Sequence, residues 1–155
     1  MRLLAAARLA TALLVLTPAA APGQVLEECG WVGNPANIVE PWAENSRTFA
    51  NGAIRIALLD TEEPVCCGFH LLILSPPGQV EGPGYRRCHV VSDRAGGLGF
   101  NHIDFAAITA SYDPALGLRV DVPFWRYTDG LDRGRPGRLA VRINQANGAV
   151  DIEAP

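Results

Sequence analysis

The sequence predicts a small, mainly β protein: an antiparallel β-sandwich or barrel that is built from hairpins and cross-linked by disulfides. Three observations lead to this prediction. Tight-turn sequences separate strand-like runs, apolar and polar residues alternate with a period of two, and four cysteines occur in a chain that begins like an exported protein. Short strands separated by regularly spaced turns are typical of sandwiches and small barrels.

The first 23 residues have the layout of a secretory signal peptide. A basic start is followed by the apolar run Leu9–Leu16 and by small residues, with cleavage expected near Gln24. The apolar run is shorter than the roughly 20 residues needed to span a bilayer. We therefore expect residues 1–23 to be removed, and residues 24–155 to form a single β-rich domain that is periplasmic or secreted, with no stable membrane insertion.

Residues 24–46 show no sustained period, because glycine and proline interrupt them every few positions. We expect this part to be an irregular segment laid over the domain and held by Trp31, Trp42 and Cys29. Residues 47–155 then form the hairpin core.

Turn chemistry marks three hairpins in that core. Asn51-Gly52 and Asn147-Gly148 each lie between strand-like runs, and Asn-Gly accepts the positive φ angles of a tight hairpin turn. The stretch from Asp113 to Gly117 matches a type I turn followed by a left-handed glycine. The chain is therefore expected to reverse at each of these points.

The strands themselves show which face is buried. Leu118, Val120, Val122 and Phe124 alternate with polar residues, and the runs 139–143 and 150–153 do the same. By contrast, His70 to Leu74 is apolar without alternation, which indicates a central strand covered on both faces. From Ile103 to Ala110 the pattern fits a short helix followed by a strand beginning near Ile108.

The four cysteines predict two structural disulfides, as is usual for a small exported domain. Neighbouring side chains on an extended strand point to opposite faces, so Cys66 and Cys67 are expected to find different partners. A hairpin centred between Pro77 and Gly78 places Cys67 opposite Cys88. The expected pairs are therefore Cys67 with Cys88 and Cys29 with Cys66.

Two other roles for these cysteines stay open. Cys66 and Cys67 could act as a thiol redox pair, although they lack the Cys-x-x-Cys spacing that lowers a thiol pKa. They could also bind a metal together with Cys88 and His89, but the spacing matches no common zinc pattern. We expect neither a metal nor a cofactor.

Composition excludes several functions. The chain has no lysine, which excludes Schiff-base chemistry, and its only methionine is the initiator, which excludes a Met-rich copper site. Without the signal peptide, 11 arginines stand against 16 acidic residues, so the formal charge is −5. A general affinity for nucleic acid is therefore not expected.

The candidate site residues are few. His102 and Asp104 would share one face of a strand and could act as base and orienting carboxylate of a hydrolase, but no nucleophile motif accompanies them. Trp125 shares the polar face of its strand, and with Tyr127 it could bind a protein or glycan partner. The one basic cluster contains Arg133, Arg135 and Arg138, which could bind an acidic partner or phosphate.

With the stretches TFANGAIRIALLDT, CCGFHLLILSPP, ITASYDPALGL and INQANGAV in view, most of the chain after residue 23 resembles uncharacterised exported proteins of GC-rich Gram-negative bacteria. The resemblance implies an exported, β-rich protein and carries no activity, ligand or catalytic residue. The leading hypothesis is a non-enzymatic binding module whose partner is a protein or an envelope component. The oligomeric state is left open.

Overall fold

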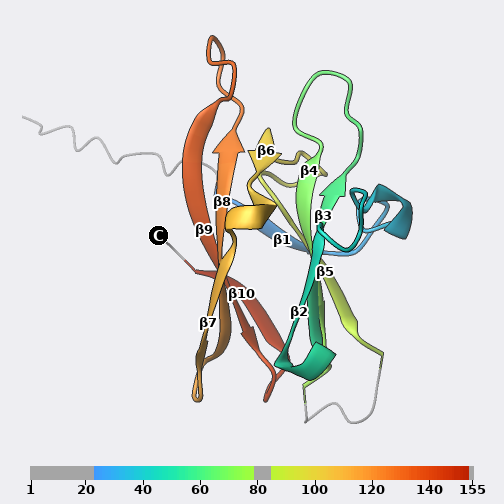
Figure 1. The fold of residues 1–155 in the computed structure, drawn as a ribbon, viewed down its shortest axis with the longest axis vertical. Coiled ribbons are helices and arrows are strands. Elements are labelled where there is room, and N and C mark those ends of the chain that lie inside the picture. The colour runs from blue at the N-terminus through green and yellow to red at the C-terminus, as the bar shows by residue number, and fades with distance from the viewer. Residues whose placement is uncertain (1–22, 79–84, 154–155) are drawn as a thin grey trace, which may run out of the picture.

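The computed structural model describes residues 23–78 and 85–153, so the predicted signal peptide lies outside the described residues apart from Gly23. The described chain forms two antiparallel sheets packed face to face (Figure 1). The predicted β-sandwich is therefore confirmed, and it is not a closed barrel. No helix in the described part is long and apolar enough to span a membrane.

The first sheet has five strands in the order β1-β5-β4-β3-β2, and every neighbouring pair is antiparallel. Its central strands β3 and β4 are the apolar runs of the sequence, which explains their place between other strands. The strands are β1 (Val25–Glu28), β2 (Ser46–Phe49), β3 (Ile54–Asp60), β4 (Phe69–Ser75) and β5 (Arg87–Ser92).

The second sheet has the order β10-β9-β8-β6, and β7 also pairs with β8. Two successive strands thus line one edge of the long strand β8. A 3-10 turn at Phe105–Ala107 separates them, as the mixed helix and strand pattern predicted. The strands are β6 (His102–Ile103), β7 (Thr109–Asp113), β8 (Gly117–Arg126), β9 (Arg135–Asn144) and β10 (Ala149–Glu153).

The main core lies between the two sheets, and the predicted alternation is confirmed. From Leu118 to Phe124 in β8, buried residues alternate with half-buried ones, and in β9 Leu139, Val141 and Ile143 are buried, although Ala140 between them is buried too. The first sheet contributes Ile54, Ile56, Leu58, Leu71, Ile73 and Val91; the second contributes Leu118, Val120, Val122, Phe124, Leu139, Val141, Ile143 and Val150.

All three predicted hairpins are confirmed. Asp113 Oδ1 accepts hydrogen bonds from the backbone N–H groups of Ala115 (2.7 Å) and Leu116 (2.9 Å), and these donors lower the pKa of this carboxyl. Gly117 closes the turn with a φ of 90°, a value for which glycine is suited. The two Asn-Gly sequences lie in four-residue connections, which are longer than the tightest hairpin turn.

The outer face of the first sheet carries a second apolar cluster. Residues 29–39 lie over it, and Val32 of this segment packs with Ala57, Leu59 and Leu72. Both faces of β4 are therefore buried, as predicted. Cys29 and Val32 contact this cluster, whereas Trp31 and Trp42, which were expected to hold the segment, are exposed. The prediction that residues 24–46 are irregular throughout is wrong at Val25–Glu28, because these residues pair through their backbone with β5 although their side chains do not alternate.

The predicted disulfide pairing is wrong. Cys29 is bonded to Cys88, and Cys66 is bonded to its neighbour Cys67. The chain bends at residues 64–66 and Cys67 has a φ of 76°, so the two adjacent residues do not lie on an extended strand. The β4–β5 register also differs from the expected one, because Leu74 lies opposite Cys88.

The two disulfides are expected to contribute differently to stability. Cys29–Cys88 closes a loop with a sequence separation of 59, so breaking it with Cys29→Ser/Cys88→Ser should lower the free energy of unfolding by about 4 kcal/mol through the freedom gained by the unfolded chain. Cys66→Ser/Cys67→Ser should cost less than about 1 kcal/mol, because neighbouring residues close no chain loop. Urea unfolding followed by circular dichroism measures both changes. Equal losses in the two variants would contradict this assignment of roles.

Candidate functional site

One end of the sandwich gathers the residues with functional chemistry. The loop 61–68 before β4, the loop 127–134 after β8 and the short strand β6 all lie at the upper end of the view in Figure 1. The register of β6 and β8 places His102 directly opposite Trp125. Their ring centroids are 5.4 Å apart with an interplanar angle of 52°. His102 is exposed and Trp125 is half-buried, whereas their neighbours Ile103 and Phe124 are buried in the core.

A surface pocket of about 390 Å³ surrounds this pair. It combines an aromatic platform with amide, carboxylate and guanidinium groups, and its volume lies in the range of small-molecule sites. The predicted residues His102, Asp104, Trp125 and Arg133 are therefore brought together. The full lining is Asn101, His102, Asp104, Trp125, Asp132 and Arg133.

Asp104 has a structural contact that the sequence did not predict. Its Oδ1 accepts a hydrogen bond of 3.1 Å from the N–H of Ala107 and so caps the 3-10 turn at Phe105–Ala107. The ring of His102 instead lies between Trp125 and Phe69, whose centroid is 5.7 Å away in an edge-on arrangement. The pocket thus contains both residues of the predicted base and carboxylate pair. The Asp104 carboxylate, however, already accepts the hydrogen bond that caps the 3-10 turn.

Backbone hydrogen bonds attach the pocket to the cysteine loop. Gly99 N–H donates to the carbonyl of Cys67 at 2.7 Å, and Phe69 and Phe100 exchange two hydrogen bonds of 2.7 and 3.2 Å. A Cβ on Gly99 would lie 2.5 Å from the carbonyl oxygens of both Cys67 and Phe69, so only glycine permits this approach. Asn101, two residues further on, lines the pocket.

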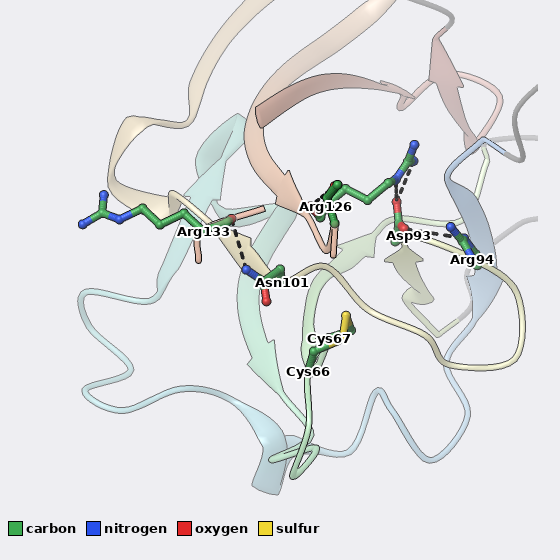
Figure 2. Close-up of a disulfide and its surroundings, with 8 residues drawn as sticks. Cys66, Cys67, Asp93, Arg94, Asn101, Arg126 and Arg133 are labelled. Carbon is green, nitrogen blue, oxygen red and sulfur yellow. Dashed lines mark hydrogen bonds and ion pairs between the residues drawn. A yellow bond between two sulfur atoms is a disulfide. The ribbon is translucent and has the colours of Figure 1, made fainter. Parts of the chain in front are cut away.

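Figure 2 shows the surroundings of the Cys66–Cys67 disulfide. Asn101 Nδ2 donates a hydrogen bond of 3.1 Å to the carbonyl of Arg133, which joins the start of β6 to the loop 127–134. In the same view the guanidinium of Arg133 extends away from Asn101. The pocket wall is therefore connected on one side to the cysteine loop and on the other to the loop after β8.

An ion pair between a buried carboxylate and a half-buried arginine joins the two sheets at this end. Asp93, 3% exposed, follows β5, and its Oδ1 lies 2.7 Å from Nε and 2.6 Å from Nη2 of Arg126, the last residue of β8 (Figure 2). Arg94 adds a longer and more exposed contact of 3.9 Å to the same carboxylate. The pair fixes the end of β8 immediately beyond Trp125.

The other predicted binding residues do not form one patch. Tyr127 is half-exposed at the start of the loop after β8, and a hydrogen bond to Asp129 raises the pKa of its phenol. Arg135 and Arg138 lie in β9, and being three residues apart on a strand they point to opposite faces. Of the three arginines in the predicted basic cluster, only Arg133 lines the pocket.

Sequence reasoning missed Asn101 and Asp132 as pocket residues and missed the Asp93–Arg126 ion pair. Asn101 directly precedes His102, so its place beside the site follows once β6 is recognised. Asp132 and Asp93 lie in loops whose positions depend on the packing of the two sheets, and nothing local in the sequence indicates their partners.

The proposed thiolate and imidazole ligands of a metal are not brought together. Cys88 is bonded to Cys29 over the outer face of the first sheet, and Cys66 and Cys67 are bonded to each other. Within residues 23–78 and 85–153, no group of three or more His, Cys, Asp or Glu side chains is arranged to hold a metal ion.

Comparisons of the chain with models of protein families, with curated proteins and with solved structures gave no match. The function must therefore be argued from the chemistry of the site itself.

His70 gives the protein a testable acid sensitivity. Its side chain is completely buried, its Nδ1 is 2.9 Å from Ser92 Oγ, and burial lowers its pKa from 6.5 to about 4 against an opposing effect of Asp60. Below pH 6.5 the unfolded chain takes up a proton that the folded chain does not. The free energy of unfolding should therefore have its full value above pH 6.5 and should fall by up to about 3 kcal/mol as the pH drops to 4.

The measurement is the free energy of unfolding of the wild type and of His70→Gln across this pH range. The variant carries no titrating ring, so its stability should fall less steeply between pH 6.5 and 4. Parallel pH profiles for the two proteins would show that His70 is not the group responsible.

Removing the arginine of the inter-sheet ion pair should be costly. Arg126→Met leaves the buried carboxylate of Asp93 without its main partner, and a loss of about 3 kcal/mol in the free energy of unfolding is expected. In Asp93→Leu/Arg126→Met no charge is left unpaired, and most of that stability should return. A double variant no more stable than Arg126→Met would mean that the ion pair itself, and not the unpaired carboxylate, determines the loss.

Proposed function

We propose that this chain is an exported, non-enzymatic β module of the cell envelope that binds a saccharide in the pocket between His102 and Trp125. The observation that carries the proposal is the composition of that pocket: Trp125 and His102 lie beside the amide of Asn101, the carboxylates of Asp104 and Asp132, and Arg133. Sugars present an apolar C–H face that stacks on an aromatic ring and hydroxyl groups that need hydrogen-bond donors and acceptors at the rim. Two disulfides support an oxidising compartment.

The shape of the site favours a saccharide over a protein partner. A protein interface usually needs a broad patch of buried aromatic anchors, whereas this site is a hollow of about 390 Å³ whose walls are polar and apolar in about equal share. The exposed aromatic residues Trp31, Trp42 and Tyr112 lie on other elements and do not extend this pocket. A compact ligand with many hydroxyl groups therefore suits the pocket better.

A hydrolase that uses His102 and Asp104 remains the second candidate. It is supported by the presence of both residues in one pocket. The pocket lining contains no serine, threonine or cysteine, so such an enzyme would have to activate water directly. Binding requires only the groups already in place, which is why it is preferred.

The test is titration with neutral and N-acetylated oligosaccharides, followed by the ¹⁵N-labelled indole signals of the three tryptophans. The Trp125 signal should shift on binding, and Trp125→Ala should weaken binding roughly tenfold or more, a loss typical of a central aromatic anchor. Trp42→Ala, which removes an equally large exposed side chain far from the pocket, is the matched control and should leave binding unchanged.

Two results would overturn the proposal. One is the absence of any shift of the Trp125 indole with the whole set of oligosaccharides at millimolar concentration. The other is cleavage of an oligosaccharide that stops in His102→Ala, which would favour the hydrolase.

A further inference from the structure

We propose that the Cys66–Cys67 disulfide is a reversible reduction site, opened by a dithiol reductant, and that its state sets the geometry of the His102–Trp125 pocket. The proposal rests on the proposed function only in treating that pocket as the binding site. Its test uses no saccharide, so the two proposals can fail separately.

The Cys66–Cys67 disulfide does little for global stability. A disulfide stabilises a fold mainly by restricting the unfolded chain, and the effect grows with the length of the loop that it closes. Cys66 and Cys67 are adjacent, so their bond closes no chain loop, whereas Cys29–Cys88 spans 59 positions. The effect of Cys66–Cys67 must therefore be local, on the backbone of the two residues and on what that backbone holds.

The Cys66–Cys67 bond maintains an unusual backbone conformation. Cys67 has a φ of 76°, in the left-handed region that residues other than glycine, asparagine and aspartate rarely adopt. The bond to Cys66 ties this residue to its neighbour. Opening the bond removes that covalent constraint and allows Cys67 to return to a negative φ.

Access to the bond is provided by the surrounding loop. Residues 62–65 are exposed, Val65 is 90% exposed, and Cys66 is only half-buried while Cys67 is 7% exposed. A reductant can therefore reach this segment from solvent at Cys66. Exposed disulfides held by an unfavourable conformation are the ones that open most readily.

A short connection leads from Cys67 to the pocket. The Cys67 carbonyl accepts the 2.7 Å hydrogen bond of Gly99, and Gly99 is packed so closely against this carbonyl that no Cβ would fit. Phe69, two residues after Cys67, pairs with Phe100 and places its ring edge-on to His102. A change of φ at Cys67 redirects this carbonyl, so it must alter the segment that leads into Asn101 and His102.

The chemistry is an ordinary thiol–disulfide exchange. The thiolate of the dithiol attacks the sulfur of Cys66, forms a mixed disulfide and releases the Cys67 thiolate, which takes a proton. The second thiol of the reductant then attacks the mixed disulfide and releases Cys66. The reductant is oxidised to its own disulfide, and two electrons and two protons are transferred to the protein.

The first experiment titrates the folded, full-length mature protein with dithiothreitol and traps thiols by alkylation before mass spectrometry. Cys66 and Cys67 are expected to be alkylated together at reductant concentrations that leave Cys29–Cys88 intact. Reduction of Cys29–Cys88 first, or no alkylation of Cys66 and Cys67 until the protein unfolds, would overturn the proposal.

The second experiment measures the effect on the pocket by amide hydrogen exchange and by the indole signals of the tryptophans. In the reduced protein, and in Cys66→Ser/Cys67→Ser, exchange at the Gly99 amide should accelerate roughly five- to tenfold, as expected when a backbone hydrogen bond is weakened. The Trp125 indole signal should shift while that of Trp42 does not, which serves as the control within each sample.

The matched variant Cys29→Ser/Cys88→Ser removes the other disulfide and should leave the Trp125 signal in place. If this variant does not fold, the oxidised wild type is compared with wild type in which only Cys66–Cys67 is reduced. The Trp42 signal is then the control within each sample. An opened Cys66–Cys67 bond with unchanged Gly99 exchange and an unchanged Trp125 signal would refute the connection between disulfide and pocket.

Discussion

Strands β3 and β4 present apolar side chains on both faces, so both faces of the first sheet must be covered. One face is covered by the second sheet, and the other by residues 29–39, which the Cys29–Cys88 disulfide fixes to β5. Without that cover, Leu59, Leu72 and Val90 would be exposed to water. The need to cover the second face thus accounts for the irregular segment, for one of the two disulfides and for the central position of β4.

Once Cys88 is bonded to the covering segment, Cys66 and Cys67 have no other cysteine partner within this chain. Their bond lies at the opposite end of β4 from Cys88, on the loop that contacts Gly99 and Phe100. One disulfide therefore stabilises the sandwich, whereas the other acts on a loop beside the pocket. This division places the Cys66–Cys67 bond, the proposed reduction site, next to the candidate binding site.

Local sequence patterns predicted the sandwich, its hairpins and the burial of alternate residues, because these features depend on turn chemistry and on a period of two. They singled out His102 with Asp104, and separately Trp125 with Tyr127, as candidate residues, but not that His102, Asp104 and Trp125 line one pocket. They did not predict β1, whose pairing is made by backbone atoms alone, or the Asp93–Arg126 ion pair, which joins loops and strands of different sheets. The cysteine pairing failed because it assumed an extended backbone at Cys67, where φ is positive.

The most direct test of this account is peptide mapping of the unreduced protein purified from an oxidising compartment. The account predicts one fragment in which the peptides of Cys29 and Cys88 are linked, and a separate single peptide containing Cys66 and Cys67 that is lighter by two hydrogen atoms than its reduced form. A link from either Cys66 or Cys67 to Cys29 or Cys88 would contradict it. In that case the covering segment would be held elsewhere, and the proposed connection between the disulfide and the pocket would lose its basis.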